Sequence, residues 1–136
     1  MGVSVALAAA PGCFPYAQTY RPALRGVIVD QAQHPVPGAQ VVTCTAERWA
    51  GLSGCPRFAE TYAGSDGRYA LPELKEMEWC CFGEAPRPMT IITACAKSED
   101  GRVIRAPSVA ATGGEDQRLE VRPPEHPYPP TCMPRW

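Results

Sequence analysis

The sequence predicts an all-β fold: a seven-stranded antiparallel sandwich of Greek-key connectivity with disulfide-stapled loops. First, short runs rich in β-branched residues alternate with clusters of turn-forming residues along the chain. Second, 12 glycines and 16 prolines interrupt the 136 residues too often for long helices. Third, seven cysteines offer cross-links to a chain whose length allows one domain only.

The predicted elements begin with a tether. Residues 14–23 are aromatic, proline-spaced and nearly uncharged, which indicates an extended lead-in to the domain. Residues 25–30 form a β-branched run bounded by the turn cluster 31–35, so they are predicted to be the first strand. Pro37 and Gly38 suit the centre of a type II turn that leads into the second strand.

The second strand is expected over residues 39–46. Strict alternation places Val42, Cys44 and Ala46 together on the more apolar of its two faces. Cys44 is therefore expected to point into the core. A long loop over residues 47–57 follows this strand.

The next two runs are expected to form a β-hairpin. Residues 58–63 and 68–71 flank a turn that contains Asp66 and Gly67. Asp-Gly between two such runs is a strong hairpin signal because glycine adopts positive φ without steric cost. Residues 72–79 are expected to form a helical turn or two, and an irregular loop follows.

The last strands precede a proline-rich tail. Residues 89–96 have the strongest strand pattern, and a second Asp-Gly turn leads into residues 102–105. Residues 117–122 alternate, with Leu119 and Val121 on one face, and form the last predicted strand. The expected organisation is a leader remnant at 1–13, a tether at 14–23, the sandwich at 24–122 and a tail at 123–136 stapled through Cys132.

The cysteine count predicts cross-linking. Seven cysteines leave one over in an oxidised protein, and Cys13 is the odd one because it closes an apolar segment. Adjacent Cys80 and Cys81 rarely bond to each other, so each is expected to bond a distant cysteine, one of these being Cys132 or Cys55. The other six cysteines form an even set without the Cys-x-x-Cys spacing of metal sites, so they indicate disulfides in an oxidising compartment. These disulfide candidates are Cys44, Cys55, Cys80, Cys81, Cys95 and Cys132.

The segment that ends at Cys13 resembles a bacterial lipoprotein lipobox. Residues 3–12 are apolar or small and carry no charge, as in the core of a signal peptide. The resemblance implies that Cys13 carries a lipid and anchors the chain to the periplasmic face of the bacterial outer membrane. The alternatives are a plain secretory leader, which gives a secreted protein, and an ordinary loop cysteine.

Three stretches resemble the carboxypeptidase regulatory-like domain, in the same order and at sensible spacing. Residues 25–30 read RGVIVD, residues 35–41 read PVPGAQV and residues 65–74 read SDGRYALPEL. The resemblance implies a transthyretin-like (prealbumin-type) sandwich. Modules of this family are mostly structural or binding units, so individual function is expected where the chain departs from the pattern, in its two cysteine-bearing loops and its tail.

Enzymes on the same sandwich require residues that this chain does not arrange. Intradiol ring-cleaving dioxygenases share these motifs and hold iron with two tyrosines and two closely spaced histidines, whereas His34 and His126 lie far apart in sequence. The hydroxyisourate hydrolases of the transthyretin group need several histidines and a C-terminal tetrapeptide that MPRW does not match. No G-x-S-x-G motif or phosphate-binding loop occurs. We therefore expect no enzyme activity, no cofactor and no metal.

The tryptophans are the candidate binding surface. Trp49 and Trp79 fall in the cysteine-bearing loops and Trp136 closes the tail, and tryptophan is enriched at binding hot spots. The alternative is that Trp49 and Trp79 pack beneath their loops. The dispersed charge, −1 in total, offers no basic patch for nucleic acid.

The function expected from these features is that of a non-enzymatic envelope lipoprotein. It binds an unknown envelope protein as an adaptor, assembly component or inhibitor, and it meets the membrane through its N-terminal lipid. The alternative is a carbohydrate-binding or adhesion module that recognises a glycan, with an intradiol-dioxygenase-like enzyme third.

Overall fold

The computed structural model describes residues 14–47, 55–80, 88–123 and 132. These residues form strands, turns and connecting segments, with no helix among them, so the all-β prediction is confirmed. The described part of the chain holds ten strands where the sequence predicts seven: β1 (Phe14–Arg21), β2 (Leu24–Val29), β3 (Gln40–Glu47), β4 (Arg57–Tyr62), β5 (Arg68–Leu71), β6 (Leu74–Cys80), β7 (Pro88–Lys97), β8 (Val103–Arg105), β9 (Val109–Ala110) and β10 (Asp116–Glu120).

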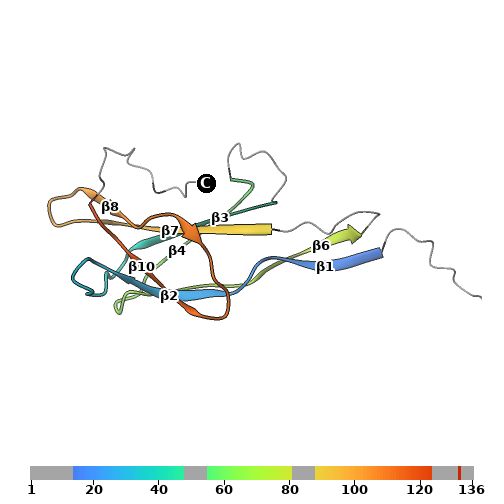
Figure 1. Cartoon of the computed structure of the whole chain (residues 1–136), viewed down its shortest axis with the longest axis horizontal. Coiled ribbons are helices and arrows are strands. Elements are labelled where there is room, and N and C mark those ends of the chain that lie inside the picture. Colours follow the sequence, from blue (N-terminus) through green and yellow to red (C-terminus); the bar gives the residue numbers. More distant parts are fainter. Residues whose placement is uncertain (1–13, 48–54, 81–87, 124–131, 133–136) are drawn as a thin grey trace, which may run out of the picture.

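Two sheets form the layers of a sandwich-like body (Figure 1). One layer has the order β10-β2-β5, and the other has the order β4-β3-β7-β8 with β9 paired to β7. β2 and β10 are parallel, which differs from the antiparallel prediction, whereas the other described pairings are antiparallel. Apolar side chains from both layers form the core: Leu24, Ile28, Ala39, Val41, Ala63, Tyr69, Leu71, Ile92, Ala94, Ala106, Leu119 and Val121.

The strands β1 and β6 pair with each other and project beyond the end of β7 (Figure 1). We call this pair the arm. β1 leads directly into β2, and β5 leads directly into β6, so the arm extends the layer that contains β2 and β5. The expected tether at 14–23 is therefore largely a strand, and the expected helical turn at 72–79 is wrong. Residues 74–78 favour helix locally, but the ladder with β1 overrides that weak preference.

The predicted hairpin is also wrong, although its turn forms. Gly67 has φ 75°, and the Asp66 carboxylate accepts a hydrogen bond from the Arg68 N–H at 3.0 Å. The flanking strands nevertheless separate, because β4 pairs with β3 and β5 pairs with β2. The Ile28 N–H donates to the Gly67 carbonyl at 2.8 Å, so the turn packs against β2 and carries the chain from one layer to the other. Each strand thereby buries one face in a shared core.

The orientation of β3 reverses the prediction. Val41 lies in the core cluster, whereas Cys44 sits on the opposite face of β3, where it is buried and bonded to Cys55. Two threonines share the core side because their hydroxyls have partners there. The Thr45 hydroxyl lies 2.8 Å from the Thr90 hydroxyl, so burying it costs little.

The remaining strand predictions agree with the structure. β7 and β8 form a hairpin through a turn in which Gly101 has φ 82°. Leu119 and Val121 are both buried in the core, as their alternation predicts. β9 was not predicted, since two residues are too few to show a pattern.

Candidate functional site

The arm has two different faces. Along β6 the side chains alternate between exposed and half-buried, and Met77 and Trp79 are 66% and 69% exposed. Their partners across the ladder are Ala17 and Pro15, which are exposed as well. We call these four residues the arm outer face. Trp79 therefore does not pack beneath a loop, because it lies in a strand and points to solvent.

The inner face of the arm is held to the other layer. The Arg57 guanidinium, from β4, donates to the Glu76 carboxylate at 3.0 Å and stacks over the Tyr20 ring, 3.7 Å from its centroid. The buried Tyr20 hydroxyl donates to the Glu78 carboxylate. A cation above an aromatic ring and a charge-assisted hydrogen bond each favour one orientation. These contacts decide which face of the arm meets solvent.

A second exposed set lies on the outer face of β4. Phe58 and Tyr62 are 46% and 62% exposed, with the exposed Glu60 between them. We call these three residues the β4 stripe. Phe58 lies opposite Cys44 in the ladder, so the stripe is on the side of β3 that faces away from the core. The stripe and the arm outer face thus lie on opposite layers of the molecule.

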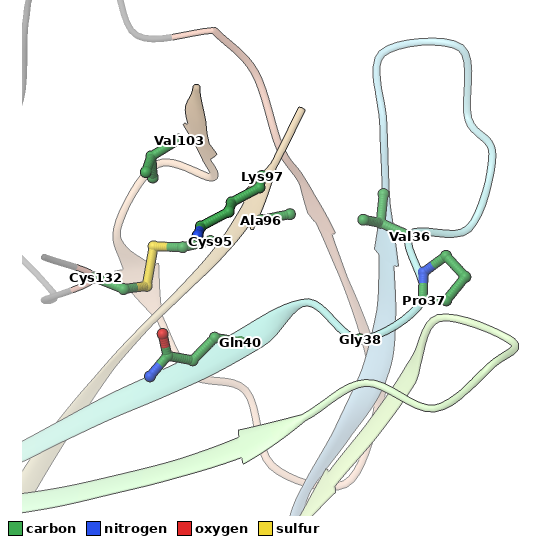
Figure 2. A pocket seen from close by; sticks show the side chains of 9 residues that line it. All are labelled: Val36, Pro37, Gly38, Gln40, Cys95, Ala96, Lys97, Val103 and Cys132. Carbon is green, nitrogen blue, oxygen red and sulfur yellow. A yellow bond between two sulfur atoms is a disulfide. The ribbon is translucent and has the colours of Figure 1, made fainter. Parts of the chain in front are cut away.

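A pocket of about 460 Å³ opens where β3 begins and β7 ends (Figure 2). The Cys95–Cys132 disulfide lies along one side of it, and Val36 and Pro37 lie across from the disulfide. Lys97 and Gln40 are the lining residues with polar side chains. The pocket's two cysteines are bonded to each other, and its lining contains no histidine or carboxylate.

Titratable groups do not assemble into a reactive centre in the described residues. No group of three or more His, Cys, Asp and Glu side chains there is placed to hold a metal ion. His34 is largely exposed, and its ring lies 3.9 Å from the Asp30 carboxylate at a turn. Burial, reinforced by the Asp116 charge, raises the pKa of Tyr69 to about 12, so this phenol stays protonated. Hydrogen bonds from Ser98 and from the Arg102 N–H lower the pKa of the exposed Asp100 in its turn.

The disulfides correct the predicted pairing. Cys44 bonds to Cys55, and Cys95 bonds to Cys132, so the expected staple on the tail is confirmed. The expectation that Cys55 or Cys132 pairs with Cys80 or Cys81 is wrong. Cys13, Cys81, Trp49, Trp136 and His126 lie outside the described residues.

The arm outer face is thus the described surface that contains a tryptophan singled out from the sequence. Alternation in β6 could have pointed to Met77 as well, whereas the β4 stripe and the pocket depend on sheet order.

Comparisons with protein-family models, curated proteins and solved structures found no match. No helix in the described ranges is long and apolar enough to cross a bilayer.

Proposed function

We propose that the chain is a non-enzymatic protein-binding module and that the arm outer face contacts its partner. The observation that supports this proposal is the exposure of Trp79 and Met77 on a strand pair whose other face is anchored by Arg57. Tryptophan buries a large area on binding and loses little conformational freedom, which suits it to a hot spot.

The architecture of the arm supports the same conclusion. A two-stranded ribbon is marginally stable in water unless something packs on it. Here the inner face is covered, and the outer face exposes two large apolar side chains beside the exposed Lys75. A partner that covers Trp79 and Met77 removes apolar surface from water, and the neighbouring ammonium lies at the rim of that contact.

For the body we propose a transthyretin-like sandwich. Apart from the arm and the two-residue β9, the described layers contain three and four strands, the number that this fold implies. The three motifs that carry the resemblance fall on β2, on the turn before β3, and on the turn and strand of β5. These positions support the proposal.

We propose further that the chain works in an oxidising compartment, at the periplasmic face of the outer membrane or secreted. Two disulfides support the oxidising compartment. For the anchor at Cys13 we expect an intact mass that includes diacylglycerol and acyl groups, with Cys80 and Cys81 titrating as two thiols after denaturation. A protein without the lipid mass contradicts the anchor, whether it has one thiol or three.

Photo-crosslinking tests the binding proposal. A benzophenone side chain at position 17, next to Met77 across the ladder, is introduced into the full-length protein in its native envelope. We expect one dominant protein adduct that is reduced at least tenfold by Trp79→Ala, since hot-spot truncation costs about 2 kcal/mol or more. The matched control carries the probe at Ala70, which is exposed on β5, and forms no such adduct.

Two results separate the alternatives. Glycan-array binding that Trp79→Ala abolishes, without a protein adduct, supports the carbohydrate-binding alternative instead. Adducts that persist unchanged in the Trp79→Ala variant contradict the arm outer face as the contact surface.

A further inference from the structure

We propose that β4 receives an extended strand from a partner, and that this strand presents apolar, basic and apolar side chains in alternation to the β4 stripe. Strand addition of this kind uses main-chain hydrogen bonds for affinity and alternate side chains for specificity. The proposal concerns the layer opposite the arm and stands independently of the arm outer face.

β4 ends its sheet with a regular strand. It has β3 on one side, and no described strand lies on its other side. The ladder with β3 runs from Gln40↔Tyr62 to Thr45↔Arg57 without a register shift, so β4 is regular over its whole length. Proteins blunt an exposed edge with proline, lysine, bulges, very short strands or charged residues. β4 contains no proline, lysine or bulge, and its two charged residues are the exposed Glu60 and Arg57, whose side chain binds Glu76 in the other layer.

The other described strands at sheet edges are shorter than β4 or contain proline or lysine. β5 has four residues, and β6 contains Lys75. β1 contains Pro15 and has a register shift between Thr19 and Arg21. β8 and β9 have only three and two residues. β10 alternates exposed charges, with Asp116 and Arg118 on its outer side. β4 is therefore the longest described edge strand without proline, lysine or a bulge, and this favours it as the pairing site.

The β4 stripe specifies the chemistry of the added strand. The Glu60 carboxylate accepts a hydrogen bond from the Gln40 amide at 2.7 Å, but no cation in the described residues forms an ion pair with it. Phe58 and Tyr62 lie two residues to either side of it on the same face. Across an added strand, an aromatic residue pairs well with a β-branched one, and a carboxylate pairs well with lysine or arginine.

Charge also argues against a second copy of this chain as the occupant. Two β4 strands can pair antiparallel with their outer faces on the same side and with position 60 at the centre of the pairing. In that register Glu60 lies directly opposite the Glu60 of the other copy. Like charges directly opposite each other destabilise a sheet pair. A different protein that places a basic residue opposite Glu60 can pair with the same edge without this repulsion.

Peptide binding with a charge reversal tests the proposal. The probe is the capped peptide TVTKTVT, which places valine, lysine and valine on one face, and the comparison peptide is TVTETVT. We expect TVTKTVT to bind roughly five- to tenfold more tightly, and Glu60→Lys to reverse the order of the two peptides. Hydrogen exchange should show new protection in β4 on binding. Trp79→Ala, on the other layer, should leave both affinities unchanged.

A backbone-blocked peptide separates strand addition from side-chain contact. TVTKTVT methylated on alternate amide nitrogens keeps every side chain but loses the donors along one edge, so we expect one of the two alternate-methylation patterns to abolish binding. Binding of both methylated forms, protection in another strand, or no binding of TVTKTVT at millimolar concentration would overturn the proposal. None of these results bears on the arm outer face, whose readout is the cross-link at position 17.

Discussion

At Gly26 the backbone of β2 passes β10 and Tyr69 too closely for any side chain. A Cβ atom at this position would lie 1.9 Å from the Gln117 carbonyl oxygen and 2.7 Å from the Tyr69 hydroxyl. We expect Gly26→Ala to lower the free energy of unfolding by about 3 kcal/mol, because strand backbone has to move. Urea unfolding monitored by circular dichroism measures this change.

Gly101→Ala is the matched control for that substitution. A Cβ atom at Gly101 would have no atom of the described residues within 4 Å, but φ is +82°, so the expected cost of about 1 kcal/mol is conformational only. Equal losses in the two variants would contradict a steric role for Gly26.

Tyr69 links stability to alkaline pH. Its buried hydroxyl donates to the Gln117 carbonyl at 3.2 Å. Burial, and to a smaller extent the Asp116 charge, raises the pKa of Tyr69 from 10.0 to about 12. The folded pKa exceeds the unfolded one, so this stabilisation is complete below pH 10 and is lost as the pH rises through 12. We expect the stability of the wild type relative to Tyr69→Phe to be constant below pH 10 and to fall above it, by on the order of 2 kcal/mol.

Rapid urea unfolding from pH 8 to pH 12 measures this difference. Spectrophotometric titration is the control. The wild type should show one phenol that ionises only near pH 12, and Tyr69→Phe should lack it. A difference in stability that stays flat across this range would contradict the raised pKa.

At the scale of elements, the arm depends on one arginine. Arg57→Ala removes both the ion pair with Glu76 and the stacking over Tyr20. We expect amide exchange in β1 and β6 to accelerate about tenfold, since a partly buried pair and a cation–π contact together contribute roughly 1–2 kcal/mol. Exchange in β2 should stay slow, because its core contacts remain.

Hydrogen exchange with mass spectrometry resolves these segments. Lys75→Ala, on the exposed side of β6, serves as the control and should change nothing beyond its own peptide. Uniform acceleration across β2 and β7 in Arg57→Ala would show that the arginine supports the whole core instead of the arm.

Strands whose pattern is local were predictable, and strands defined by distant partners were not. β2, β3, β7 and β10 show β-branched runs or alternation bounded by turns, and each lies close to its predicted position. β6 consists largely of helix-favouring residues and becomes a strand only because β1, far earlier in the chain, pairs with it. The hairpin failed for a related reason: β4 and β5 each gain more from a separate partner than from each other.

The candidate surfaces, like the strands, were predictable only where the signal is local in the sequence. Trp79 could be singled out by residue type, but its exposure depends on which side of β6 Arg57 binds. The β4 stripe could not be found from the sequence, because an edge exists only once the order of strands is known. The cysteine count predicted cross-links, but not which pairs the ladders bring together.

For the whole molecule, the two described disulfides should contribute unequally to the free energy of unfolding. Cys95 and Cys132 are separated by 37 residues, and Cys44 and Cys55 are separated by 11. Loop-closure entropy predicts that replacing the first pair with serine costs about 4 kcal/mol and replacing the second costs about 3 kcal/mol. Each double variant serves as the other's control in thermal unfolding, and a larger loss from the shorter loop would contradict the entropic account.

The parallel pairing of β2 with β10 has a consequence for the life of the chain before it is folded. β2 cannot complete its ladder until β10 exists, since Arg25 pairs with Asp116 only after the 90 residues between them have been made. A nascent chain that still lacks β10 therefore has an open core, because Leu119 is missing from it. Synthesis of β10, and not an early nucleus at β2, then sets the moment at which this body becomes resistant to proteases.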